Sequence, residues 1–204
     1  MIVERLGRVG YDAARELQRR ARAEVLDGGP DRVLLLEHDP VVTLGRRGGA
    51  VDRAALLALD TPVVETERGG LATWHGPGQL VGYPIVDLGR AKVSVPTFVA
   101  RLGELMRAVA ADVGVEVAYD DARPGVYRDG RKLGSIGLHV HRGVTMHGFA
   151  LNVDIDLRGF QAIVPCGIAG LFVSSLARER GAPVAFDAVL AACEARLPSL
   201  LDPA

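Results

Sequence analysis

Short apolar runs that end in turn residues dominate the sequence and commit much of the chain to β-structure. The runs at 32–37 (RVLLLE) and 40–45 (PVVTLG) are separated by His-Asp-Pro, which predicts two strands of a hairpin or sheet. PVVETE at 62–67 predicts a further strand, and LVGYPIVDL at 80–88 contains too much Gly and Pro for a helix. Strand patterns return from 115 to 155. A sheet is therefore the expected framework of the fold.

Helical periodicity appears in stretches between and around these strands. Residues 94–113 begin with Ser94 as a predicted N-cap, end before Gly114 and carry their apolar side chains on one stripe. Further helices are predicted at 11–26, 52–59 and 186–197. Asp129-Gly130 is typical of a two-residue type I′ hairpin turn, with Lys132 just beyond it. Together these patterns predict an α/β fold of the α+β type around a mixed, largely antiparallel sheet.

The composition narrows the class of protein. A chain of 204 residues, 49% hydrophobic and 24% charged, fits one globular domain spanning 1–204. No run approaches the apolar length of a membrane span, and charges in MIVERLGRVG argue against a signal peptide, so we expect a cytoplasmic protein without membrane contact. A net charge of -1 gives no field for gathering nucleic acid. Both cysteines are expected to be reduced.

The densest cluster of chemically capable residues runs from Arg68 to Gln79 (RGGLATWHGPGQ). Its glycines would let a ligand approach the backbone closely, although glycine-rich segments also form plain turns between strands. The spacing in GPGQLVG does not match a dinucleotide fingerprint, and the chain contains no G-K-[ST]. Thr73, Trp74 and His75 within the segment favour a binding site over a simple turn.

Cys166 is the better of two candidate nucleophiles. It lies between Pro165 and Gly167 on a predicted turn, whereas Cys193 falls on the apolar stripe of the last helix, as a small buried hydrophobe would. A free thiol with a pKa of about 8.5 needs roughly 2 kcal/mol of stabilisation to be half ionised at neutral pH, which one nearby ammonium can supply. Lys132 is the candidate for that role; the alternative is a solvated lysine beside a turn.

Three histidines and one serine offer alternative chemistries. His139 and His141 share one face of a predicted strand and His147 follows, so a metal site is an alternative. The simpler interpretation is that the pair marks the solvent side of a strand whose other face carries apolar residues, and no metal is expected. Ser135 lies in G-S-I-G, which is not the G-x-S-x-G elbow of serine hydrolases.

Several blocks of sequence resemble one enzyme family. The chain resembles the octanoyl-(acyl carrier protein):protein N-octanoyltransferases, also called lipoyl transferases, of lipoate biosynthesis. The resemblance rests on five blocks in the family's order: LEHDPVVTLGRRG (36–48), ERGGLATWHGPGQLVGYPIVDL (67–88), GRKLGSIG (130–137), HGFALNV (147–153) and PCGI followed by SSL (165–176). One departure is Gly134, where the family more often has Ala.

The resemblance implies a fold shared with lipoate and biotin protein ligases, with a larger and a smaller sheet around an acyl-binding cleft. It implies that Cys166 accepts the acyl group and that Lys132 is its acid/base partner. It also implies a substrate site lined by Arg68, Gly69, Gly70, Leu71, Ala72, Thr73, Trp74, His75, Ser135, Ile136, Gly137, Gly148, Phe149 and Ala150.

The implied reaction moves an octanoyl group from octanoyl-acyl carrier protein to the lysine of a lipoyl domain. The implied acceptors are the lipoyl domains of 2-oxoacid dehydrogenase complexes and the glycine cleavage H protein. No cofactor is expected, because one thioester replaces another on the enzyme. Two alternatives remain at this point: an ATP-dependent lipoate or biotin ligase of the same fold, and a non-catalytic module that binds acyl groups or lipoyl domains.

Overall fold

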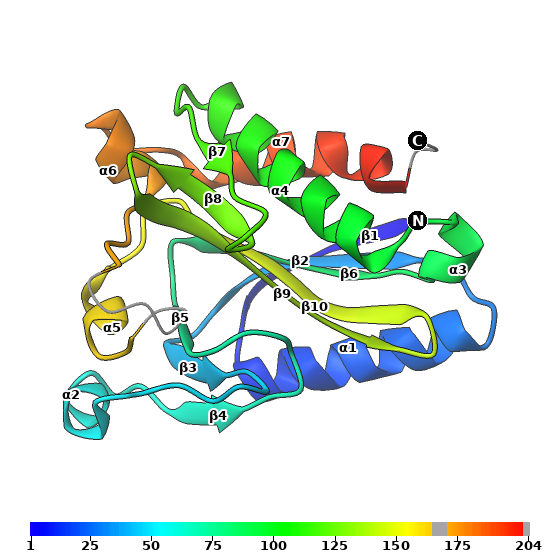
Figure 1. Cartoon of the computed structure of the whole chain (residues 1–204), viewed down its shortest axis with the longest axis horizontal. Coiled ribbons are helices and arrows are strands. Elements are labelled where there is room, and N and C mark those ends of the chain that lie inside the picture. Colours follow the sequence, from blue (N-terminus) through cyan, green and yellow to red (C-terminus); the bar gives the residue numbers. More distant parts are fainter. Residues whose placement is uncertain (165–170, 202–204) are drawn as a thin grey trace.

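The apolar runs of the sequence form two sheets in the computed structural model, which describes residues 1–164 and 171–201. Within these residues, a seven-stranded sheet has the order β1-β2-β6-β10-β9-β8-β7 and a three-stranded sheet has the order β4-β3-β5 (Figure 1). The pairing is antiparallel except between β1 and β2 and between β3 and β4. The predicted mixed, largely antiparallel α/β fold is confirmed.

Groups of one to four consecutive strands are separated by helices along the chain. The strands are β1 (Ile2–Val9), β2 (Arg32–His38), β3 (Val41–Leu44), β4 (Val63–Glu65), β5 (Thr73–His75), β6 (Gln79–Ile85), β7 (Ala118–Tyr119), β8 (Gly125–Arg128), β9 (Arg131–His141) and β10 (Val144–Asn152). The helices are α1 (Tyr11–Leu26), α2 (Arg53–Ala58), α3 (Leu88–Ala91), α4 (Val95–Asp112), α5 (Arg158–Gln161), α6 (Leu176–Arg180) and α7 (Phe186–Arg196), followed by a 3₁₀ helix at Leu197–Leu201.

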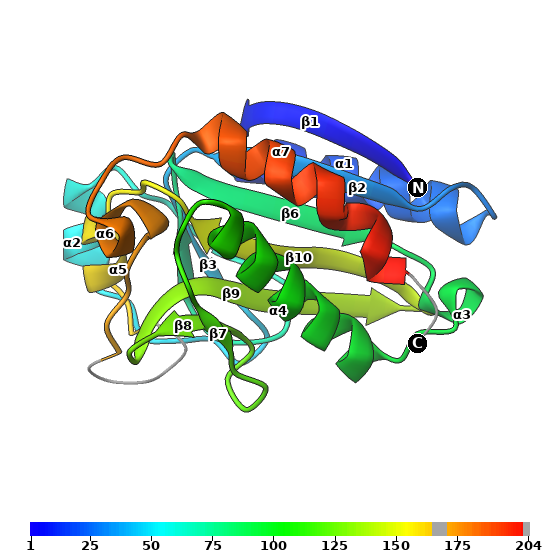
Figure 2. The ribbon, with the colours of Figure 1, turned by 90° about the horizontal axis from the view of Figure 1, so that it is seen from above.

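Helices cover both faces of the large sheet. Helix α1 lies on one face, while α4 and α7 lie side by side on the other (Figures 1 and 2). Alternation along β2 shows why both faces are apolar: Val33 and Leu35 pack beneath α4 and α7, whereas Leu34 and Leu36 pack against α1. A separate apolar cluster contains side chains of the small sheet, α2 and α5 packed together. The cores thus lie between layers of helix and sheet.

The most strongly predicted helix forms for the expected reasons. The side chain of Ser94 accepts a hydrogen bond from the Thr97 N–H at 3.2 Å, which caps the first turn of α4. Gly114, with φ +79°, follows the helix in the left-handed conformation that glycine adopts readily. The predicted helices at 11–26, 52–59 and 186–197 are confirmed as α1, α2 and α7.

The hairpin prediction at Asp129-Gly130 is also confirmed. These two residues join β8 to β9, and both have positive φ, +47° and +77°, as a type I′ turn requires. The His-Asp-Pro turn behaves differently: the strands on either side of it, β2 and β3, belong to different sheets, so they do not form a hairpin. Strand β1, which pairs parallel with β2 at the sheet edge, was not predicted.

No helix of the described residues is both long enough and apolar enough to cross a membrane.

Candidate functional site

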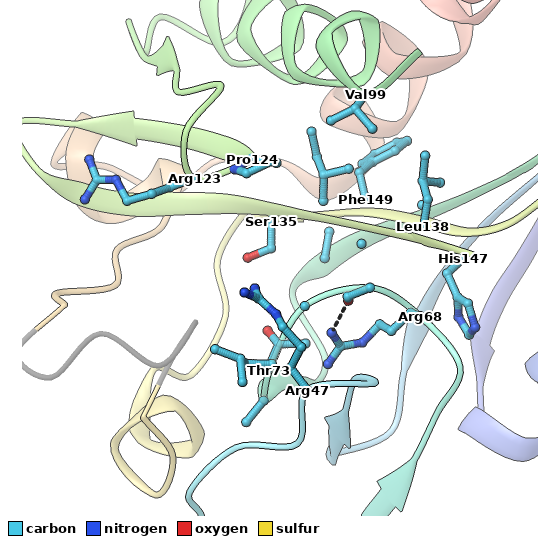
Figure 3. Close-up of a pocket in the computed structure, with 18 of the residues that line it drawn as sticks. Arg47, Arg68, Thr73, Val99, Arg123, Pro124, Ser135, Leu138, His147 and Phe149 are labelled. Carbon is cyan, nitrogen blue, oxygen red and sulfur yellow. Dashed lines mark hydrogen bonds between the residues drawn. The ribbon is translucent and has the colours of Figure 1, made fainter. Parts of the chain in front are cut away.

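A cavity of about 490 Å³ opens where the small sheet meets the large one. Its walls come from the glycine segment after β4, from β5, β6, β9 and β10, and from α1 and α4. Figure 3 shows Arg47, Arg68, Thr73 and Ser135 on one side of the β9–β10 ribbon. Val99 and Phe149 lie on the other side, so residues from both sides of the ribbon line the cavity. Its volume is within the ordinary range of small-molecule sites.

Facing glycines form part of the cavity lining. Gly137 of β9 pairs with Gly148 of β10, so neither strand projects a side chain there. A Cβ on Gly137 would come within 3.1 Å of the Gly69 carbonyl oxygen. The Gly69 N–H in turn donates to the Leu138 carbonyl at 2.8 Å, so the glycine segment adds itself to the edge of β9. The glycines here allow the close approach of another part of the chain, while the predicted approach of a ligand stays a prediction.

Arg68 fastens the glycine segment to the small sheet. Its side chain is buried, with the residue 8% exposed. Nη2 donates to the Thr43 carbonyl at 2.6 Å, Nε donates to the Thr43 hydroxyl at 3.1 Å, and Nη1 donates to the Gly69 carbonyl at 3.0 Å. The dashed line in Figure 3 marks a hydrogen bond of Arg68 within the site. A buried guanidinium held in this way is a fixed positive charge at the cavity wall.

A chain of hydrogen bonds crosses from the large sheet to the small one through His75. Asn152 Nδ2 donates to the Ser174 carbonyl at 2.8 Å, and Gln79 Nε2 donates to Asn152 Oδ1 at 2.9 Å. Gln79 Oε1 then accepts from His75 Nδ1 at 2.7 Å, which leaves His75 Nε2 facing the Thr43 hydroxyl at 3.4 Å. This network assigns the proton to Nδ1. Burial lowers the pKa of His75 to about 3, so the ring is neutral.

An aromatic and imidazole cluster lies beside His75. His38 donates through Nδ1 to the Val9 carbonyl at 2.8 Å and contacts the Tyr83 hydroxyl through Nε2 at 2.7 Å. Burial lowers the pKa of His38 and His147 and raises the pKa of Tyr83 well above its usual value. Burial also raises the pKa of Tyr11 to about 12. These imidazole and phenol groups are therefore uncharged at neutral pH, while the Glu67 carboxylate lies 3.8 Å from His147 Nε2.

A β-bulge places Lys132 in the cavity. Val126 pairs with Gly134 and Tyr127 pairs with Lys132, so Leu133 is the extra residue on β9. Strict alternation would put Lys132 and Ser135 on opposite faces of the strand, but the bulge returns both to the cavity side. Leu133 instead packs into the core beneath α4. Lys132 is 4% exposed, and its Nζ lies 5.1 Å from the centre of the Tyr127 ring.

The backbone of Lys132 is bonded to the segment that follows the predicted nucleophile. Its N–H donates to the Phe172 carbonyl at 2.9 Å, and its carbonyl accepts from the Ser174 N–H at 2.9 Å. Val164, which precedes Cys166 by two residues in the sequence, donates its N–H to the Ala50 carbonyl at 3.2 Å. Cys166 itself lies outside the described residues.

The structure places nearly all of the described residues expected at the site around one cavity. Trp74 is the exception. On β5, Thr73 and His75 point into the cavity, so Trp74 points away and packs edge-on against Phe160, with ring centres 5.5 Å apart. The expected residues that line the cavity are Lys132, Arg68, Gly69, Gly70, Leu71, Ala72, Thr73, His75, Ser135, Ile136, Gly137, Gly148, Phe149 and Ala150.

Burial bears on the predictions for Cys193 and for the His139–His141 pair. Cys193 is fully buried in the core, as predicted, and burial raises the pKa of its thiol to about 12. His141 is exposed and His139 is half-buried, on the face of β9 opposite Ile136 and Leu138. Within residues 1–164 and 171–201, no group of three or more His, Cys, Asp or Glu side chains is arranged to hold a metal ion.

Several lining residues were not predicted from the sequence. They come from elements far apart in the chain, and single residues such as Tyr11 on a helix give no local signal of a site. His147 belongs to the block HGFALNV that resembles the family, but its left-handed backbone, φ +58°, could not be inferred from the sequence. The residues that line the cavity without having been predicted are Tyr11, Arg47, Tyr83, Val95, Val99, Ala122, Arg123, Pro124, Leu138 and His147.

Comparison with known sequences identifies relatives over nearly the whole chain. Residues 11–197 match the family model described as the lipoyl protein ligase A/B catalytic domain. An octanoyltransferase of Mycobacterium sp. (strain KMS) is 48% identical over 206 residues, covering 98% of this chain and 85% of the relative. An octanoyltransferase of Mycobacterium tuberculosis H37Rv is 47% identical over 204 residues, covering 98% of this chain and 86% of the relative.

Solved structures with the same fold are lipoate and biotin protein ligases. Lipoate-protein ligase A bound with ATP has a TM-score of 0.76 at 16% identity, covering 98% of this chain and 86% of that one. The bi-partite lipoate protein ligase studied with its E2 lipoyl domain from Thermoplasma acidophilum has a TM-score of 0.74 at 16% identity, with 98% and 84% covered. Biotin protein ligase from Aquifex aeolicus with biotin and ATP has a TM-score of 0.61 at 13% identity, with 98% and 70% covered.

Proposed function

Since the chain belongs to the lipoyl protein ligase A/B catalytic domain family, we propose that it is an octanoyltransferase that works through a Cys166 acyl-enzyme. It takes the octanoyl group from octanoyl-acyl carrier protein and passes it to the lysine of a lipoyl domain. Relatives that share nearly half of its residues over most of their length are octanoyltransferases. A ligase of the same fold has been studied with its E2 lipoyl domain, which supports a lipoyl domain as the acceptor.

The observation that carries the proposal is the position of Lys132. A lysine is rarely as buried as this one, and here it lines a cavity that opens between the two sheets. Phe172, whose carbonyl binds the Lys132 N–H, follows Cys166 by six residues. A chain of that length can span at most roughly 20 Å when fully extended, so this sequence separation allows the proposed pairing of Cys166 with Lys132.

The proposed chemistry has two steps. The thiolate of Cys166 attacks the thioester carbon of the donor, and the bond to the carrier protein's sulfur breaks. The leaving sulfur takes a proton from the Lys132 ammonium, which gives an acyl-enzyme, a free carrier thiol and a neutral Lys132 amine. In the second step the acceptor amine attacks the enzyme thioester and gives up its proton to Lys132, and Cys166 leaves as a thiolate.

The rest of the cavity suits a neutral acyl chain. Leu71, Ala72, Ile136 and Phe149 provide apolar surface, and the Gly137–Gly148 pair leaves room over the backbone. Each methylene buried there is worth about 0.8 kcal/mol. Because the imidazole and tyrosine side chains are uncharged, they add no further charged group beside the acyl chain.

Intact-mass measurement tests the proposal directly. The protein is mixed with octanoyl carrier protein without ATP and is expected to gain one octanoyl group, which a lipoyl domain then removes. Cys166→Ser is expected to abolish the gain or to hold the group as a stable ester, while Cys193→Ala, a change of the buried cysteine, is expected to leave it intact. An octanoyl adduct that requires ATP would favour a ligase, and reversible binding without any adduct would favour a non-catalytic module.

A further inference from the structure

One carboxylate outside the cavity is bonded to both structural neighbours of Lys132. Arg131, which precedes Lys132 on β9, donates from Nε to Glu179 Oε1 and from Nη2 to Oε2, both at 2.8 Å. The hydroxyl of Ser174 donates to the same Oε1 at 2.5 Å. The Glu179 side chain, on α6, is only 7% exposed. Arg128 adds a third cation, with Nε 3.7 Å from Oε2.

These contacts surround the backbone bonds that hold Lys132. Val173 forms a parallel β-bridge with Lys132, flanked by the hydrogen bonds of Phe172 and Ser174 to the Lys132 backbone. Glu179 accepts a hydrogen bond from the Ser174 hydroxyl, and the Asn152 side chain donates one to the Ser174 carbonyl. Ser174, on one side of the bridge, is therefore held by two side chains.

The bulge at Leu133 explains why such ties matter. A one-residue change of register turns every side chain on a strand to the opposite face. Lys132 reaches the cavity only because the bulge falls at Leu133. Glu179 binds the side chains of Arg131 on β9 and of Ser174 on the bridged segment. These bonds oppose a change of register at Lys132.

We propose that Glu179 is a positioning residue for acyl transfer, whose carboxylate fixes the register of Lys132 against the segment 172–174 and so keeps the amine in the cavity. This inference rests on the proposed function, because it assigns to Lys132 the role of partner to Cys166. Glu179 itself touches no reacting atom. Its action runs through Arg131 and Ser174.

The direction in which the pKa of Cys166 changes in Glu179→Gln distinguishes a positioning role of Glu179 from a purely electrostatic one. Hydrogen bonding from Arg131 lowers the pKa of Glu179 to about 2, so the carboxylate is ionised at any assay pH. Neutralising it removes a negative charge, which by itself would make a nearby thiolate easier to form. Misplacing Lys132 removes a cation from the thiolate and has the opposite effect. A positioning role therefore predicts that the pKa of Cys166 rises in Glu179→Gln.

The test measures the rate of Cys166 alkylation by iodoacetamide against pH, together with single-turnover acylation by octanoyl carrier protein. Lys132→Met serves as the reference variant. Glu194→Gln is the matched control, because Glu194 is also bonded through both oxygens to one arginine, Arg5, but joins α7 to β1 elsewhere. Ser174→Ala removes a single hydrogen bond to Glu179, and this variant replaces Glu179→Gln in the test if Glu179→Gln folds poorly.

In Glu179→Gln we expect the alkylation midpoint to rise by about one pH unit, a tenfold change in ionisation, and acylation to slow by about tenfold with the donor KM unchanged. Ser174→Ala should shift both in the same direction by less, and Glu194→Gln should shift neither. If Glu179→Gln leaves the midpoint unchanged or lowers it while Lys132→Met raises it, the positioning role is refuted and the Cys–Lys pair stands. If Lys132→Met has no effect on the midpoint, the pair itself fails and the inference falls with it.

Discussion

Replacing His75 by Asn should make the stability of the protein less dependent on pH. In the folded state burial lowers the pKa of His75 to about 3, whereas an imidazole in the unfolded chain has a pKa near 6.5. The unfolded chain therefore binds more protons between these values, and the free energy of unfolding falls as the pH falls below 6.5. From pH 7 to pH 5 the loss is about 2 kcal/mol, at about 1.36 kcal/mol for each pH unit below 6.5.

Urea unfolding followed by circular dichroism at pH 7, 6 and 5 measures this dependence. Asn can still donate to Gln79, so His75→Asn is expected to fold, at some cost at pH 7, but to lose about 2 kcal/mol less than the wild type over this range. His141→Asn removes an exposed imidazole and is expected to follow the wild type. Equal slopes for the wild type and His75→Asn would refute the argument that a buried neutral His75 is linked to stability.

Two further predictions concern packing around the site. Trp74→Phe is expected to lower stability by about 2 kcal/mol without changing the KM for the acyl donor, since Trp74 packs outside the cavity; a changed KM with unchanged stability would contradict this. Gly125→Ala is expected to cost more stability and activity than Gly134→Ala. A Cβ at 125 would meet the Gly134 carbonyl oxygen at 2.3 Å and Lys132 Cε at 2.9 Å, whereas a Cβ at 134 would meet two side-chain atoms, Met106 Sδ and Val126 Cγ2, both at 2.8 Å. Thermal melts and initial rates measure both variants, and the reverse order would be the contrary result.

Local patterns in the sequence were sufficient to predict most of the helices and strands. The cap at Ser94, the turn at Asp129-Gly130 and the apolar stripe of α4 each depend on residues close together in the chain, so they are readable without knowledge of the fold. Strand β1 escaped prediction because its partner on the sheet, β2, follows a whole helix later. Its edge position leaves Ile2 and Val3 partly exposed, so the strand lacks a regular buried pattern.

The candidate site was predictable where backbone approach decided the residue type. Gly69 lies in a glycine-rich segment that the sequence shows directly, whereas Gly137 was expected only from the family resemblance. In the structure another segment lies against each of these two glycines. The face on which a side chain lies was harder to predict. Trp74 points away from the cavity by strand alternation, and Lys132 reaches it only because of a bulge, which depends on the pairing of β8 with β9.

The two sheets are joined at the site by directional bonds as well as by apolar packing. The apolar cluster of the small sheet contains Trp74, which points away from the cavity, and it reaches the cavity wall only at Ala72. On the cavity side the connection runs through Gln79, His75, Thr43 and Arg68, and every bond in it has a fixed direction. Apolar contacts tolerate small sliding movements, whereas a buried polar chain loses free energy whenever one member loses its partner. The polar chain therefore opposes sliding of one sheet past the other, which gives a physical reason for buried polar groups beside a cavity that also has apolar walls.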